Sequence, residues 1–148
     1  MPTLATPTDE RTQARELEFE QLALERERYA DLFAFAPEAY LVTDPYGMIM
    51  EANTAAGRLL ETSPEGLRGR ALDLFIPLEQ RRVFRGRLAA MAAGAGTERM
   101  TWRGGLRGVR TDLGVDFTVG CVRHRSLPMF TLCWLLRPLE DRSAASFI

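Results

Sequence analysis

The sequence predicts an α+β protein in which an amphipathic helix precedes a five-stranded antiparallel sheet. Three observations lead to this fold class. A long, charged helical pattern occupies residues 9–36 at the start of the chain. Two strand-like runs follow it and three more lie near the end, whereas the shorter helical segments are grouped between them. Grouped elements favour antiparallel pairing, and 148 residues suffice for one domain with its own core.

The first helix carries the residues that we expect to form a dimer interface. Residues 1–8 are small, polar and proline-containing and are predicted to be disordered, Asp9 is a suitable N-cap, and Pro37 ends the helix. The apolar pattern is imperfect and too short for a coiled-coil assignment. A helix this long needs packing partners, so we expect a homodimer that depends on residues 9–28, and the candidate interface residues are Leu17, Phe19, Leu22, Leu24 and the adjoining Tyr29. In a rival arrangement, which is also compatible with a dimer, the helix folds back over the less apolar face of the sheet and covers Val122, Cys133 and Leu135.

The first two strands form a predicted β-hairpin. Residues 39–44 and 48–52 are rich in β-forming residues, and the turn residues Pro45-Tyr46-Gly47 separate them. Asp44 is expected to hold this turn through backbone amides, as aspartate does in many turns.

Several short helical segments and one longer helix follow the hairpin. Asn53 is a predicted N-cap, Ser63 and Pro64 have the residue types of a helix start, and residues 71–75 form a further short segment. Residues 78–93 predict a longer helix with arginines over much of its surface. Its apolar side is expected to contain Leu78, Val83, Phe84, Leu88 and Met91.

The last part of the chain predicts three strands. Residues 98–103 form the first and continue irregularly to residue 111, and residues 115–123 and 129–137 form the other two. A turn centred on residues 125–128 predicts a specific register for the last pair, with Cys121 opposite Leu132, Val119 opposite Trp134 and Phe117 opposite Leu136.

This register makes one face of the pair uniformly apolar and therefore suits a buried core. It also places Cys121 and Cys133 on opposite faces, which excludes a disulfide between them.

The composition excludes several classes of function. The 19 basic and 20 acidic residues give a net charge of −1, so no overall field attracts nucleic acid or an anionic membrane. No apolar run reaches the ~20 residues of a membrane helix, and the N-terminus does not resemble a signal peptide, so a cytoplasmic protein is expected. All the basic residues are arginine, which excludes a P-loop lysine and a Schiff-base lysine. His124 is the only histidine, and we predict neither a catalytic nor a metal site.

Several stretches of the sequence, in their order and spacing, resemble a PAS domain. The resemblance covers about Tyr29 to Arg137 and rests on Ala36–Asp44, Gly47–Ile49, Glu51–Leu60, the S-x-E-x-L-x-G form within Ser63–Arg70, and the closing strand Leu132–Arg137. It implies a PAS domain over residues 29–138, with helices on one face of the sheet, and a tail over residues 139–148. Many relatives continue after the last strand with Arg-Asp-Ile-Thr, whereas Pro138-Leu139-Glu140-Asp141 follows here.

Two cofactors known in this family do not fit the sequence. A flavin photoreceptor needs a reactive cysteine on the short helix after the Gly-Arg pair, and Leu72 occupies that position. A haem sensor commonly takes its axial histidine from the long helix, and residues 78–93 contain none. The cofactor, if there is one, is therefore unidentified.

The resemblance also implies where a ligand pocket would lie, between the helices and the sheet. The residues expected to face this region are Leu41, Thr43, Met48, Met50, Val119, Cys121, Trp134 and Leu136. Because most are large and apolar, a filled core is the favoured interpretation and a ligand pocket is the alternative. We expect a signalling module that acts through homodimerisation and contact with a protein partner, without catalysis of its own. The alternative is a PAS sensor that binds a small molecule or cofactor.

Overall fold

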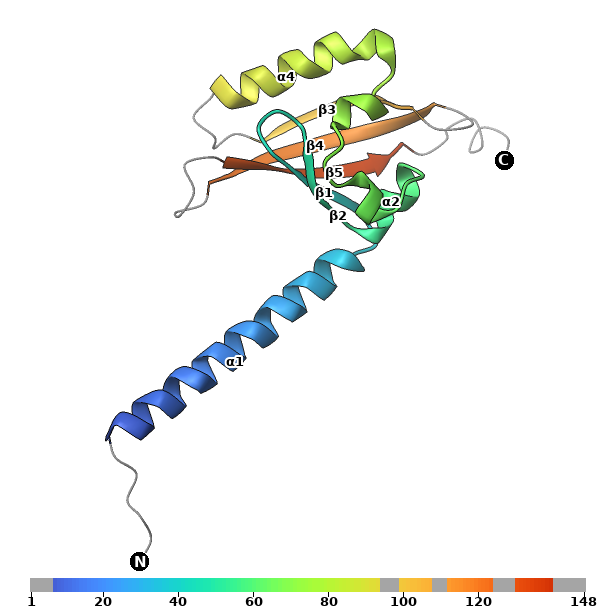
Figure 1. Ribbon diagram of the computed structural model, residues 1–148. Coiled ribbons are helices and arrows are strands. Elements are labelled where there is room, and N and C mark those ends of the chain that lie inside the picture. Colours follow the sequence, from blue (N-terminus) through green and yellow to red (C-terminus); the bar gives the residue numbers. More distant parts are fainter. Residues whose placement is uncertain (1–6, 94–98, 108–111, 124–129, 140–148) are drawn as a thin grey trace, which may run out of the picture. The chain divides into compact units, whose positions relative to one another are not determined.

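The structure, a computed structural model, describes residues 7–93, 99–107, 112–123 and 130–139 (Figure 1). The chain divides into two compact units, residues 1–33 and residues 34–148. The first unit contains one helix, α1 (Pro7–Ala34). This helix covers almost the same residues as the predicted one, and each of its ends lies two residues earlier. His124 and the residues of the predicted turn 125–128 lie outside the described residues.

The second unit contains one sheet and several short helices. Its strands are β1 (Ala39–Thr43), β2 (Ile49–Ala52), β3 (Met100–Leu106), β4 (Leu113–Arg123) and β5 (Phe130–Pro138). Its helices are α2 (Thr54–Leu59), α3 (Pro64–Leu67), α4 (Arg81–Ala93) and the 3₁₀ helices η1 (Leu72–Phe75) and η2 (Leu78–Gln80). The five strands pair antiparallel in the order β2-β1-β5-β4-β3, which confirms the predicted sheet.

The helices cover one face of this sheet, as the resemblance implied, and α4 runs along that face (Figure 1). We call the covered side the inner face and the opposite side the outer face. The inner face of the last strand pair has the predicted register, with Cys121 opposite Leu132 and Val119 opposite Trp134. Cys121 and Cys133 are both free thiols on opposite faces. The alternation of apolar residues therefore predicted this part of the fold correctly.

The second strand differs from the prediction because it contains a bulge. Val42 pairs with Glu51 and Thr43 pairs with Ile49, so Met50 is left without a partner between them. Strict alternation placed Met48 and Met50 on the inner face, and that assignment is wrong: their side chains are 39% and 48% exposed, whereas Ile49 is 1% exposed. The extra residue reverses the side of the strand that faces the core.

The apolar side of the longer helix is also narrower than predicted. Phe84, Leu88 and Met91 are buried at helical spacing, but Leu78 and Val83 are 73% and 59% exposed. Leu78 belongs to the 3₁₀ turn η2, which has fewer residues per turn than an α-helix and places this side chain out of phase with the buried stripe. Val83 precedes the buried Phe84, and consecutive residues of an α-helix point about 100° apart around the axis. Val83 therefore does not share the buried side of the helix with Phe84.

Asp44 holds the turn of the β1–β2 hairpin, as predicted. Its Oδ1 accepts hydrogen bonds from the backbone N–H groups of Tyr46 and Met48, both at 2.9 Å. Gly47 has a positive φ of 88°, a conformation that favours glycine.

Asn53 is the predicted N-cap of α2 and does more than cap it. Its Oδ1 accepts from the backbone N–H of Ala56 at 2.9 Å and from that of Tyr40 at 3.0 Å, and its Nδ2 donates to the carbonyl of Glu38 at 2.8 Å. The side chain is 1% exposed, so one buried amide joins α2 to the start of β1.

Candidate functional site

Four aromatic rings fill the centre of the inner face. Phe84 of α4, Trp102 of β3, Phe117 of β4 and Trp134 of β5 contact one another, with ring centroids 5.4–6.4 Å apart. The pairs adopt stacked, tilted and edge-on arrangements, which are favourable geometries for aromatic rings. This aromatic cluster occupies the region in which the sequence predicted a filled core or a ligand pocket.

The polar atoms beside the cluster are bonded to protein. Trp134 Nε1 donates to Thr43 Oγ1 at 2.9 Å, and Thr43 Oγ1 donates to the carbonyl of Asp44 at 2.9 Å. Both side chains are almost fully buried, at 1% and 0% exposure. The Thr43 hydroxyl, the polar group best placed to orient a ligand here, therefore uses its donor within the protein.

The structure brings together most of the predicted pocket residues. Leu41, Val119 and Leu136 are buried with Thr43 and Trp134 in one core, and Cys121 packs partly buried against it. Met48 and Met50 lie outside this group because of the bulge in β2. The six residues that do meet are part of a packed core rather than of the cavity described next.

A cavity of about 220 Å³ opens at the edge of the sheet, between η2 and α4 on one side and β3 on the other. It borders the aromatic cluster but does not include Trp134. Its lining residues are Ile76, Glu79, Gln80, Val83, Phe84, Arg87, Trp102, Arg103, Gly104, Gly105 and Phe117. We call it the edge cavity.

Arg87 has an unusual environment in the edge cavity. The centre of its guanidinium lies 4.8 Å from the ring centroid of Trp102, in a cation–π arrangement. Its Nε is buried and has no hydrogen-bond partner among the described residues. Gln80 of η2 bridges the two sides of the cavity, because its Oε1 accepts a hydrogen bond from Gly105 N of the edge strand at 2.8 Å.

The sequence does not predict the edge cavity. Its patterns predict only a helix over residues 78–93 with arginines over much of its surface, and a strand that continues irregularly through Gly104-Gly105. The available signal was a tryptophan followed closely by two glycines in one strand, since glycine in a strand can mark a close approach of another group. The wall that faces these glycines comes from η2 and α4, about 20 residues earlier in the chain. Local sequence patterns cannot predict that these helices lie against the edge strand.

The thiols do not have the properties of catalytic nucleophiles. Burial raises the pKa of Cys121, and the nearby Arg123 lowers it by a smaller amount. Burial also raises the pKa of Cys133, and Cys121 and Glu51 add to this increase. Reactive cysteines have lowered pKa values. Within the described ranges no group of three or more His, Cys, Asp or Glu residues is placed to hold a metal ion.

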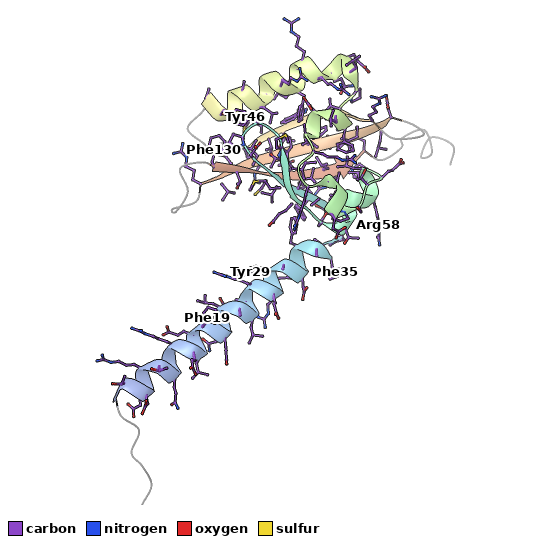
Figure 2. All side chains as sticks on the ribbon, viewed as in Figure 1. Phe19, Tyr29, Phe35, Tyr46, Arg58 and Phe130 are labelled. Atoms are coloured by element: carbon purple, nitrogen blue, oxygen red, sulfur yellow. The ribbon has the colours of Figure 1, made fainter. Side chains whose placement is uncertain are left out.

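Two surfaces expose apolar side chains. On α1, the five predicted interface residues are 53–74% exposed, and Figure 2 shows Phe19 and Tyr29 projecting from the helix. On the outer face of the sheet, Tyr40, Val122 and Cys133 are exposed, and Val42 and Leu135 beside them are only partly buried. Soluble monomers rarely leave large contiguous apolar areas uncovered.

The comparisons with known proteins agree with this architecture. Residues 27–92 match a family model described as "PAS domain". The fold is similar to the PAS domain of an HTR-like protein from Haloarcula marismortui, with 17% identity, a TM-score of 0.71, and coverage of 84% of this chain and 99% of that one. No curated protein matches the chain.

Two further solved structures have the same fold. The PAS domain of nitrogen regulation protein NR(II) from Vibrio parahaemolyticus is 18% identical, with a TM-score of 0.59 and coverage of 74% of this chain and 95% of that one. A PAS domain of a LuxR-family transcriptional regulator from Burkholderia thailandensis, solved in complex with ethanol, is 16% identical, with a TM-score of 0.60 and coverage of 76% and 98%. No helix in the described residues is long and apolar enough to span a membrane.

Proposed function

Because the chain contains a PAS domain, we propose that it is a signalling module that forms a homodimer and acts by contact with a protein partner, without a catalytic step of its own. Domains of the same fold occur in nitrogen regulation protein NR(II) and in a LuxR-family transcriptional regulator, and this supports a role in signalling. The proposal rests on how the apolar surface of this chain is distributed.

The exposed apolar residues of α1 carry the proposal. Leu17, Phe19, Leu22, Leu24 and Tyr29 are 61%, 74%, 53%, 65% and 72% exposed on a helix of 28 residues. An isolated helix gains little stability from its own hydrogen bonds and needs tertiary or quaternary packing. A second copy of the helix supplies apolar surface of the same kind, and the glutamates and arginines between these residues can pair across the contact.

The filled inner face favours signalling through protein association rather than through a cofactor bound inside the domain. The aromatic cluster occupies the space between α4 and the sheet, and the Thr43 hydroxyl is bonded to Trp134 and Asp44. A ligand in this region would have to displace several packed rings, each of which is worth a large burial free energy. The exposed side chains of the outer face offer a second surface for a partner.

The alternative function, a PAS sensor that binds a small molecule, is favoured by one observation. The edge cavity is open to small solutes and is lined by an arginine whose Nε has no partner among the described residues. The ethanol complex of the Burkholderia thailandensis domain is an example of a small molecule on this fold.

Light scattering on two double variants of the full chain tests the dimer. Phe19→Glu with Leu22→Glu places two charges among the exposed apolar residues of α1, and we expect it to change a dimer into a monomer. The control, Gln13→Glu with Gln21→Glu, adds the same charge to the same helix without removing apolar surface. It should remain a dimer.

Circular dichroism should show that both variants keep their helix and sheet content. A monomeric wild-type chain, or an apolar-to-charged variant that dimerises as strongly as wild type, would overturn the proposed dimer.

A further inference from the structure

The edge cavity has the size of a site for a very small molecule. Pockets for drug-sized ligands enclose about 300–1,000 Å³, whereas this cavity has a volume of about 220 Å³. Its walls are mainly apolar and include Val83, Phe84, Trp102 and Phe117. An occupant of this cavity is therefore compact and mostly apolar.

The backbone of the edge strand forms one wall. Gly104 and Gly105 present no side chains there, and a Cβ on Gly104 would come within 3.1 Å of Phe117 Cε2. A Cβ on Gly105 would come within 3.1 Å of Pro77 Cγ. Because both positions lack a side chain, Phe117, Pro77 and Gln80 can pack closely against the backbone of β3 in this wall.

Arg87 supplies the charge. The neighbouring Arg85 pairs with Asp73 at 2.9 Å, and Arg103 pairs with Asp116 at 3.2 Å, but Arg87 has no ion pair among the described residues. Among the described residues, Glu79 is the acidic residue in the lining, and it forms no ion pair with Arg87. Arg87 therefore has no direct anionic partner among the described residues.

The guanidinium of Arg87 also lies over an aromatic ring. Its centre is 4.8 Å from the ring centroid of Trp102, and a planar guanidinium presents a fork of N–H donors that matches the two oxygens of a carboxylate. A buried donor without an acceptor is unfavourable, so an anionic group next to Arg87 would improve the environment of this side chain.

We propose that the edge cavity binds a small organic carboxylate, with its carboxylate group on Arg87 and its apolar body between Val83 and Trp102. This inference rests on the alternative function above, the small-molecule sensor, and names the chemical class of its ligand. The site is separate from the predicted pocket: it is lined by none of Leu41, Thr43, Val119 and Trp134.

Titration of the full chain with benzoate, followed by nuclear magnetic resonance, tests the site. Benzamide, an uncharged analogue of similar shape, is the control. The chain has two tryptophans, so two indole N–H signals report on two places. We expect benzoate to move the Trp102 signal in a saturable manner. The Trp134 signal should move much less because its N–H is bonded to Thr43. Benzamide should bind about tenfold more weakly, because a charge-assisted hydrogen bond is lost.

Two variants test whether Arg87 is the charged group that binds benzoate. Arg87→Gln should weaken benzoate binding about tenfold or more, whereas Arg82→Gln, an exposed position on the same helix outside the cavity lining, should leave it unchanged. An unchanged Trp134 signal in both variants shows that the core is intact. The proposal is overturned if benzoate fails to bind, if benzamide binds equally well, or if Arg87→Gln binds like wild type. Light scattering on the α1 variants does not involve this cavity, so the dimer proposal stands or falls separately.

Discussion

The two faces of the same sheet differ in what covers them, although both are rich in apolar residues. The inner face is closed by α4 and the shorter helices, and its strands contribute Phe117, Val119, Leu132, Trp134 and Leu136, all at 0–1% exposure. On the outer face, Val122 is 40% exposed and Tyr40 is 36% exposed. Val122 comes from β4, where it alternates with the buried residues, and Tyr40 comes from β1, where it lies between the buried Ala39 and Leu41.

This difference indicates that the inner face contributes mainly to folding stability and the outer face mainly to association. Side chains on the inner face already have their contacts within the domain, so changes there should lower the free energy of unfolding. Side chains on the outer face and on α1 have free apolar area, so changes there should affect association more than folding. The following predictions test this division, from the largest expected effect to the smallest.

Trp134→Ala should give the largest effect. The indole is 1% exposed, contacts three other rings and donates a hydrogen bond to Thr43. Removal of a large buried aromatic side chain costs about 3–5 kcal/mol of stability. Chemical denaturation measures the change, and a midpoint close to that of wild type would show that the inner face is not the main source of stability.

Asn53→Ala tests the polar side of the same core. The variant loses the cap of α2 and the hydrogen bonds to the backbone of Tyr40 and Glu38. Because buried backbone groups then remain unpaired, we expect the free energy of unfolding to fall by about 2–3 kcal/mol. Ser63→Ala is the matched control. The Ser63 hydroxyl caps α3 with a single exposed hydrogen bond to Gly66 N, and its loss should cost about 1 kcal/mol. Equal losses in the two variants would contradict a special role for Asn53.

Two valines on one strand compare the faces directly. Val119 is 0% exposed on the inner face, and Val122 is 40% exposed on the outer face. Val119→Ala should cost about 2 kcal/mol through lost burial and a cavity, whereas Val122→Ala should stay within about 0.5 kcal/mol. Denaturation of both variants in parallel measures the difference. A loss at Val122 as large as that at Val119 would mean that the outer face is covered within the folded chain.

The two cysteines should show the smallest effect, a difference in alkylation rate. Both thiols have raised pKa values, so the thiolate fraction of each near pH 8 should be below that of an unperturbed cysteine, whose pKa is about 8.5. Alkylation should therefore be slow at neutral pH and accelerate at higher pH than for a free thiol. Cys133 is exposed and Cys121 is partly buried, so Cys133 should react first. Mass spectrometry of digested protein measures both rates, and rapid labelling of Cys121 at pH 7 would contradict this assignment.

The sequence predicted the strand pair β4–β5 well because a single register makes one face of both strands uniformly apolar. Alternation failed in β2, where the unpaired Met50 has no distinct residue type to announce a bulge. The resemblance implied helices on one face of the sheet, and the structure confirms this, but the ring contacts of Phe84 and Trp102 depend on where α4 crosses the strands. The edge cavity depends on the same crossing, and the sequence pattern of neither element contains that information.

Native mass spectrometry of the full chain tests the central claim most directly, because it measures the assembly and any retained cofactor together. The account predicts a species at twice the 16.6 kDa mass of the chain, without the additional mass of a flavin or haem. The inner face is already filled by protein side chains, and α1 brings the apolar surface for a second copy. A single-chain species at all protein concentrations, or a species that carries a cofactor of that size, would contradict the account.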